Sequence, residues 1–88
     1  MKLKEGFLLR EVAGQWVVVP LGERVVEFNG IMTLSESGAL LWGKLKEGTT
    51  EEELLQVLMA EYSVDEDIAK KDIQEFIQSI KDKGLIEA

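Results

Sequence analysis

The sequence predicts an α+β fold, in which a small three-stranded antiparallel sheet is followed by three helices. The first 34 residues are rich in β-branched and aromatic side chains, whereas after Leu34 the apolar residues recur at spacings of three and four. A chain of 88 residues removes only about 60–65% of its unfolded surface from water, enough for a single small core. We therefore expect one domain that spans residues 1–88.

The strands are expected within residues 7–34. Phe7–Val12 and Trp16–Val19 favour two strands, and Ala13-Gly14-Gln15 between them is typical of a hairpin connection. Pro20 has no N–H for a strand ladder, so it is expected to end the second strand or to lie on a bulge.

A third stretch, from Val25 to Leu34, fits two structures. Val26, Phe28, Met32 and Leu34 would share one face of a long bulged strand, but Asn29-Gly30 is also the preferred pair for a two-residue turn. The pattern leaves both alternatives open.

Three helices are expected at about residues 35–46, 50–62 and 65–83. Ser35 can cap the first helix and Gly48 can end it. Thr50-Glu51-Glu52-Glu53 matches a capping box at the second start, and Asp65 opens the third helix. Apolar side chains make one continuous stripe along the third helix: Ala69, Ile73, Phe76, Ile77 and Ile80.

The end of the last helix has its own signals. Lys81 and Lys83 suit a helix C-terminus, and Gly84 tolerates the left-handed cap conformation. Leu85 and Ile86 are then expected to pack back on the core.

The net charge of −7 comes from 17 acidic and 10 basic side chains, and the excess lies in residues 50–88. An acidic surface there could attract a basic partner. However, six of these acids stand at two expected helix starts, where carboxylates stabilise the helix dipole. We therefore interpret most of the acidic excess as helix capping.

The chain contains no cysteine and no histidine, which removes thiolate nucleophiles, imidazole bases and zinc sites. The serine and threonine hydroxyls thus have no histidine to activate them, and no Asp-x-Asp-x-Asp-Gly loop is present. We expect no enzymatic activity, no metal and no cofactor. Arg10 and Glu11 interrupt the apolar run near the start, which is therefore too short for a signal peptide or a membrane span. We expect a complete, soluble, cytoplasmic protein.

Nucleic-acid binding has to be weighed, since three helices beside a small sheet are also the outline of a winged helix. A helix that reads DNA needs basic and amide side chains on its exposed face. The last helix instead exposes acids mixed with two lysines: Glu66, Asp67, Glu75 and Asp82 with Lys70 and Lys71. Phosphates would meet net negative charge, so this function is disfavoured.

Binding of another polypeptide remains. A small sheet ends in edges with unpaired N–H and C=O groups, to which an extended peptide can add a strand, and the furrow beside a helix can supply pockets. The alternative is a structural module, in which the edge strand pairs with a second copy as a homodimer.

Residues 28–42 resemble a sequence motif of a known protein family. Leu34-Ser35-Glu36-Ser37-Gly38-Ala39-Leu40-Leu41-Trp42 is similar to the Leu-Asn-x-x-Gly-Ala-x-x-Trp run of the PqqD-like family. Further similarity follows at Gly48–Leu54, Tyr62–Asp65, Asp72–Ile77 and Lys83–Ile86, so the resemblance extends over nearly the whole chain.

The resemblance implies a winged-helix-like domain that recognises the leader segment of a ribosomally made precursor peptide. The leader would lie as an added strand beside Ile31, Met32, Thr33 and Leu34, and against a helix flank made of Asp72, Phe76, Ser79 and Lys83. The domain would act as a non-enzymatic chaperone that presents the leader to a modifying enzyme, commonly of the radical S-adenosylmethionine type.

Two features differ from the family pattern. Ser35 stands where the family usually has Asn, a replacement that still caps a helix. The stretch from Arg24 to Gly30 is longer than in members that act in pyrroloquinoline quinone biosynthesis. The pathway is therefore left open between quinone synthesis and another peptide modification.

Overall fold

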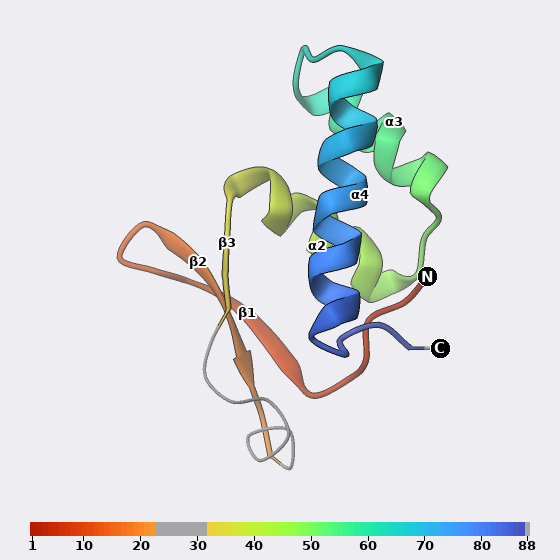
Figure 1. Cartoon of the computed structure of the whole chain (residues 1–88). Helices are drawn as coiled ribbons and strands as arrows, with labels where there is room; N and C mark the ends of the chain where they lie inside the picture. Colours follow the sequence, from red (N-terminus) through yellow and green to blue (C-terminus); the bar gives the residue numbers. More distant parts are fainter. Residues whose placement is uncertain (23–31, 88) are drawn as a thin grey trace.

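The computed structural model describes residues 1–22 and 32–87. The two alternatives for the third stretch, a bulged strand or a turn at Asn29-Gly30, concern residues outside this part of the chain. The elements follow in the order β1 (Phe7–Val12), β2 (Gln15–Pro20), β3 (Met32–Leu34), α2 (Glu36–Glu47), α3 (Glu51–Glu61) and α4 (Glu66–Asp82). The α+β fold is confirmed, with a three-stranded antiparallel sheet before three helices (Figure 1).

The sheet has the strand order β1-β2-β3, and both pairs are antiparallel. Leu9, Val18 and Met32 lie directly opposite one another across the three strands and therefore share one face. Val18 is fully buried, which identifies this face as the one that meets the core. Within the described residues, β3 forms one edge of the sheet.

The hairpin between β1 and β2 is tighter than expected. Val12 pairs with Gln15, so the connection is the two-residue turn Ala13-Gly14 and not the three-residue one. Ala13 and Gly14 have φ angles of 52° and 80°, and positive φ at both positions matches the twist of a hairpin. As expected, Pro20 ends β2.

The first helix follows the strand directly. Ser35 is its N-cap, and its hydroxyl oxygen accepts a hydrogen bond of 3.1 Å from the Gly38 N–H. Gly48 ends the helix at a φ of 98°, a conformation that suits glycine. Both cap predictions are confirmed.

The second and third helix starts differ in detail from the prediction. Thr50 caps α3 by accepting from the Glu53 N–H at 3.2 Å. The Glu53 carboxylate, however, accepts the hydroxyl of Thr49 at 3.2 Å, so it does not act as the predicted partner of Thr50. Asp65 precedes α4 as its N-cap without a side-chain cap hydrogen bond.

The end of α4 is closed by a Schellman motif around Gly84. Gly84 has a φ of 72°, its N–H donates to the Lys81 carbonyl at 2.9 Å, and the Leu85 N–H donates to the Ile80 carbonyl at 3.0 Å. Leu85 is buried, and Ile86 packs against the core, as the sequence predicts.

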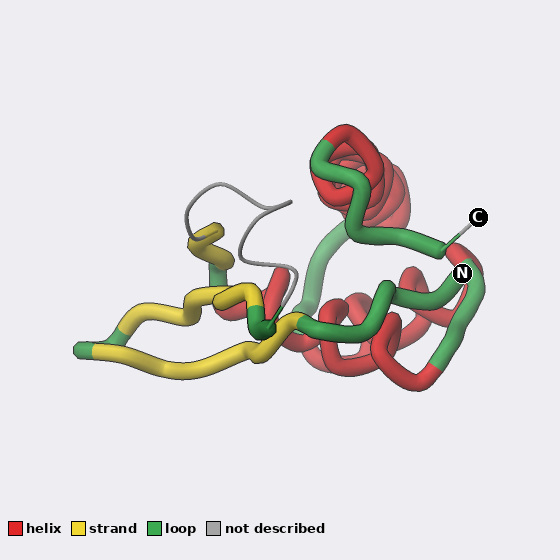
Figure 2. The backbone as a smooth tube through the Cα atoms, turned by 90° about the horizontal axis from the view of Figure 1, so that it is seen from below, coloured by secondary structure: helices red, strands yellow, loops and turns green. Residues whose placement is uncertain are grey.

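One core joins the inner sheet face to all three helices. Its helical members include Trp42, Leu45, Leu54 and the α4 stripe. In Figure 2 the β1–β2 hairpin extends away from the helices, and α4 is seen nearly end-on. The helices thus cover only part of the sheet, and β3 lies beside them.

The two ends of the described chain lie together. Leu3 is buried and pairs with Ile86 in an antiparallel bridge, and the Met1 ammonium donates to the Thr49 carbonyl at 2.6 Å. This N-terminal contribution to the core is absent from the sequence prediction, because three residues carry no periodic signal.

Acids occupy the first turn of every described helix. Glu36 stands in α2, Glu51–Glu53 in α3, and Glu66 and Asp67 in α4. These positions support the interpretation of the acidic excess as helix capping. No helix in residues 1–22 or 32–87 has the length and apolar character needed to cross a membrane.

Candidate functional site

A groove of about 470 Å³ lies between β3, the start of α2 and α4. It brings together six of the eight residues that the sequence predicts as a site: Met32, Thr33, Leu34, Asp72, Phe76 and Ser79. The remaining lining residues are Ser35, Ser37, Gly38, Leu41, Leu58 and Glu75. Residues far apart in the sequence therefore form one continuous surface.

The strand side of the groove is β3. Trp16, Val17 and Val18 of β2 pair with one edge of this strand, so its other edge faces the groove among the described residues. Met32 is buried, Leu34 is half-buried and Thr33 is exposed. A strand paired on one side only presents backbone N–H and C=O groups on the other, and these are available to an added strand.

The helix side is one strip of α4. Asp72, Phe76, Ser79 and Lys83 follow at spacings of four, three and four, which keeps them within an arc of about 60° on the helix surface. Phe76 is half-buried and packs against the core, while Asp72 is exposed. The strip therefore has an apolar centre and polar ends.

Gly38 of α2 lies beneath the Phe76 ring. A Cβ at Gly38 would lie 3.5 Å from Cε1 of Phe76, 3.5 Å from Cβ of Leu34 and 3.3 Å from Oγ of Ser35. The missing side chain thus lets α2 approach the strand and α4 closely. Leu34, Gly38 and Phe76 together form the apolar floor of the groove.

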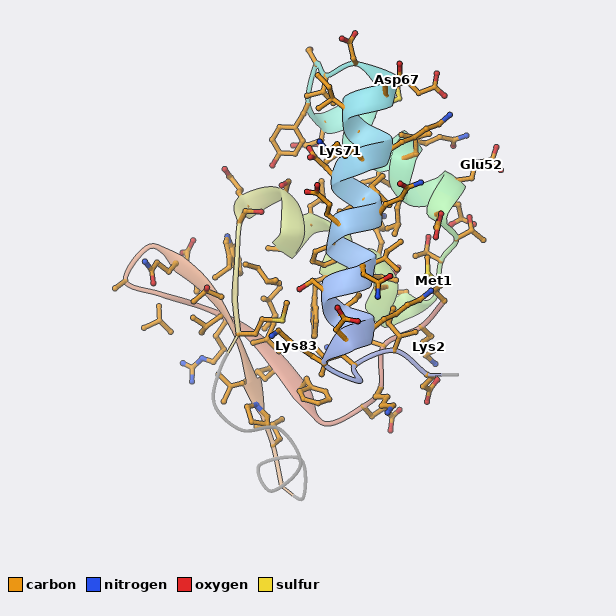
Figure 3. The ribbon with its side chains drawn as sticks, viewed as in Figure 1. Met1, Lys2, Glu52, Asp67, Lys71 and Lys83 are labelled. Carbon is orange, nitrogen blue, oxygen red and sulfur yellow. The ribbon has the colours of Figure 1, made fainter. Side chains whose placement is uncertain are left out.

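Two of the predicted site residues are not on the groove lining. Ile31 lies outside the described residues. Lys83 is exposed at the C-terminal end of α4, one turn beyond Ser79, and Figure 3 shows it on the side of α4 that faces the sheet. It continues the strip past the end of the groove.

A smaller hollow of about 300 Å³ extends the groove at its other end. It shares Ser35, Ser37, Leu58 and Asp72 with the groove, and Tyr62 and Val64 add apolar surface. A bound chain that passes the end of β3 would therefore meet a further apolar contact.

Sequence reasoning missed several of these residues. Gly38 was visible only as part of the family motif, and its contact with Phe76 depends on how α2 and α4 pack. Leu58, Tyr62 and Val64 belong to another helix and its exit loop, whose periodicity indicates core contacts but no groove. Glu75 is exposed and lies beside the strip on α4, so its position could have been found from the helical spacing.

Another hollow of about 470 Å³ separates α3 from α4. Its walls include Glu51, Glu52, Glu66 and Lys70, and Lys70 pairs with Glu66 at 3.5 Å. Its lining also includes the apolar residues Leu55 and Ile73, but none of its lining residues belongs to a strand, so we assign the site to the β3–α4 groove.

The fold and the groove define a small winged-helix-like α+β protein with an open strand edge beside a helix. Residues 15–86 match the model of the family described as "Coenzyme PQQ synthesis protein D (PqqD)". This match extends over most of the sequence, and the chain therefore belongs to the PqqD family.

Two solved structures are similar to this chain. The first, described as "TbiB1 in Complex with the TbiA(beta) Leader Peptide", is 26% identical, with a TM-score of 0.78 over 100% of this chain and 96% of that chain. The second, "Lasso peptide synthetase B1 complexed with the leader peptide", is 23% identical, with a TM-score of 0.74 over 96% of this chain and 93% of that chain. The search of curated proteins gave no match.

Proposed function

We propose that this protein binds the leader segment of a ribosomally synthesised precursor peptide in the β3–α4 groove. It acts as a non-enzymatic adaptor that presents the leader to a modifying enzyme. The observation that carries the proposal is the groove itself, which joins an open strand edge to an apolar floor and a helical strip. The two similar structures, each described as a complex with a leader peptide, support it.

Strand addition supplies the main-chain part of the binding. The edge of Met32–Leu34 that has no partner strand among residues 1–22 and 32–87 offers N–H and C=O groups to an extended peptide, and this contact tolerates many sequences. Selectivity comes from side chains of the peptide that reach the floor at Leu34 and Phe76. Because β3 has three residues, the bound segment is short, on the order of five to seven residues.

The modification itself belongs to a partner. The chain has no cysteine or histidine, and the described groove combines hydroxyls, carboxylates and apolar groups without an imidazole base. We propose that the partner is a modifying enzyme, with the radical S-adenosylmethionine type as the leading candidate. Quinone synthesis and another peptide modification both remain compatible with this role, and the cytoplasm, where precursors are translated, is its proposed location.

The test requires peptides that bind. Random peptides of about 12 residues, long enough for one strand and its flanks, are selected by display on the full chain. The affinity of the selected peptides is then compared between wild type and Ser79→Gln, in which a larger neutral side chain enters the groove from a half-buried position. Ala60→Gln, at an exposed site of α3 that lines neither the groove nor the hollow beside it, is the matched control.

We expect Ser79→Gln to weaken binding about tenfold or more, equivalent to at least ~1.4 kcal/mol, while Ala60→Gln leaves the affinity unchanged. Equal affinities in the two variants would refute the groove as the binding site. Size measurement across protein concentrations adds a second check, since a peptide-independent dimer that blocks the edge favours the dimerisation alternative.

A further inference from the structure

The charged side chains at the two ends of the groove strip have opposite signs. Asp72 and Glu75 lie towards the N-terminal end of the groove strip, and both are exposed. Lys83 is exposed beyond the other end, on the side of α4 that faces the sheet (Figure 3). Within the described residues, Asp72, Glu75 and Lys83 form no ion pair, so these charges are available to a bound chain.

The chain directions relate this charge order to a peptide. In Figure 1, β3 runs towards α2 while α4 runs the opposite way, from α3 to the C-terminus. Both existing strand pairs of the sheet are antiparallel, and antiparallel pairing is slightly more stable per residue. A peptide added antiparallel to β3 therefore runs in the same direction as α4, with its N-terminal part near Asp72 and its C-terminal part near Lys83.

The spacing of the charges can be converted into peptide residues. Asp72 lies in α4, and Lys83, the C-cap of this helix, follows eleven residues later, which corresponds to about 16 Å at 1.5 Å per residue. An extended strand spans this distance in about five residues. Because alternate side chains of a strand share a face, complementary charges on the peptide fall about four or six residues apart.

We infer that the groove selects leader segments in which Lys or Arg stands about four or six residues before Asp or Glu, and that Asp72 and Lys83 read this charge order. This inference rests on the proposed function. Main-chain pairing alone accepts either charge order, so the two ends of the strip determine which segment of a leader is bound and in which register.

The test uses the same display library on three proteins. The first is wild type, and the second is the charge-exchanged variant Asp72→Lys/Lys83→Glu. The third, Asp67→Lys/Lys81→Glu, exchanges the same charge types at exposed sites of α4 outside the groove strip and is the control for charge exchange as such. Far-ultraviolet circular dichroism and thermal unfolding verify that wild type and both variants are folded.

Peptides selected on wild type and on the control variant are expected to carry the base before the acid. Those selected on Asp72→Lys/Lys83→Glu are expected to carry the reverse order. For one wild-type peptide, exchanging its own two charged residues should lower the affinity about three- to tenfold at low salt. This difference should shrink as salt screens the exposed charges.

The inference is overturned if the wild-type pool has no charge order, or if the order does not change in the exchanged variant. In either case the proposed function stands as long as Ser79→Gln still weakens binding relative to Ala60→Gln. If those two variants bind equally, the proposed function fails, and the charge order found belongs to another surface.

Discussion

The Phe76 ring covers Gly38, and a Cβ at Gly38 would stand 3.5 Å from Cε1 of that ring. This contact ties α4 to the start of α2 beside β3, and it sets the depth of the groove. Since Gly38 and Gly43 belong to the same helix, and a Cβ at Gly43 would meet nothing within 4 Å, the two glycines form a natural pair for mutation.

Leucine at these two glycines should have opposite effects. Gly38→Leu places a side chain against Phe76 and Leu34, and overpacking of this kind costs about 1–3 kcal/mol and fills the groove. Gly43→Leu enters open space and should stabilise the helix by about 0.5–1 kcal/mol. Urea unfolding and peptide affinity measure both effects, and equal stability of the two variants would contradict the packing described for Gly38.

Alanine at Gly84 should destabilise the end of α4. Gly84 has a φ of 72°, and a residue with a Cβ pays about 1–2 kcal/mol in this conformation. Gly84→Asn should cost less, because asparagine tolerates the left-handed region better than alanine does. Thermal unfolding of the two variants checks the order, and an unchanged melting temperature for Gly84→Ala would speak against the Schellman motif.

The caps of α3 and α4 should respond differently to alanine. Thr50 accepts a hydrogen bond from the Glu53 N–H, so Thr50→Ala should lower the free energy of unfolding by about 1 kcal/mol. Asp65 makes no side-chain cap hydrogen bond, and Asp65→Ala should therefore lose only the dipole contribution of about 0.3–1 kcal/mol. Denaturant unfolding at the same salt concentration compares the two variants. A larger loss of unfolding free energy in Asp65→Ala than in Thr50→Ala would contradict the capping roles described for these residues.

Local signals predicted the helices well. Ser35, Thr50 and Gly84 each mark a helix boundary by chemistry that acts within four residues, so a single sequence is sufficient to find them. The hairpin turn was misplaced by one residue, because positive φ at Ala13 is unusual for alanine and gives no sequence signal. The Glu53 carboxylate accepts a hydrogen bond from Thr49 and not from Thr50, and this choice of partner likewise depends on side-chain geometry.

The groove was predictable only in part. The spacing of Asp72, Phe76 and Ser79 on one helix face follows from helical geometry, but their role came from the family resemblance. Contacts between distant segments, such as Gly38 with Phe76 or Leu3 with Ile86, result from packing that no local pattern encodes. The hollow lined by Tyr62 and Val64 likewise results from packing between segments that are distant in the sequence.

The most direct test of leader binding is amide chemical-shift mapping of the full chain with a display-selected peptide. We expect the largest shifts at Met32, Thr33 and Leu34, with further shifts at Phe76 and Ser79 and slowed amide exchange on β3, since strand addition protects edge N–H groups. Shifts confined to residues 50–62, with β3 unchanged, would contradict the account.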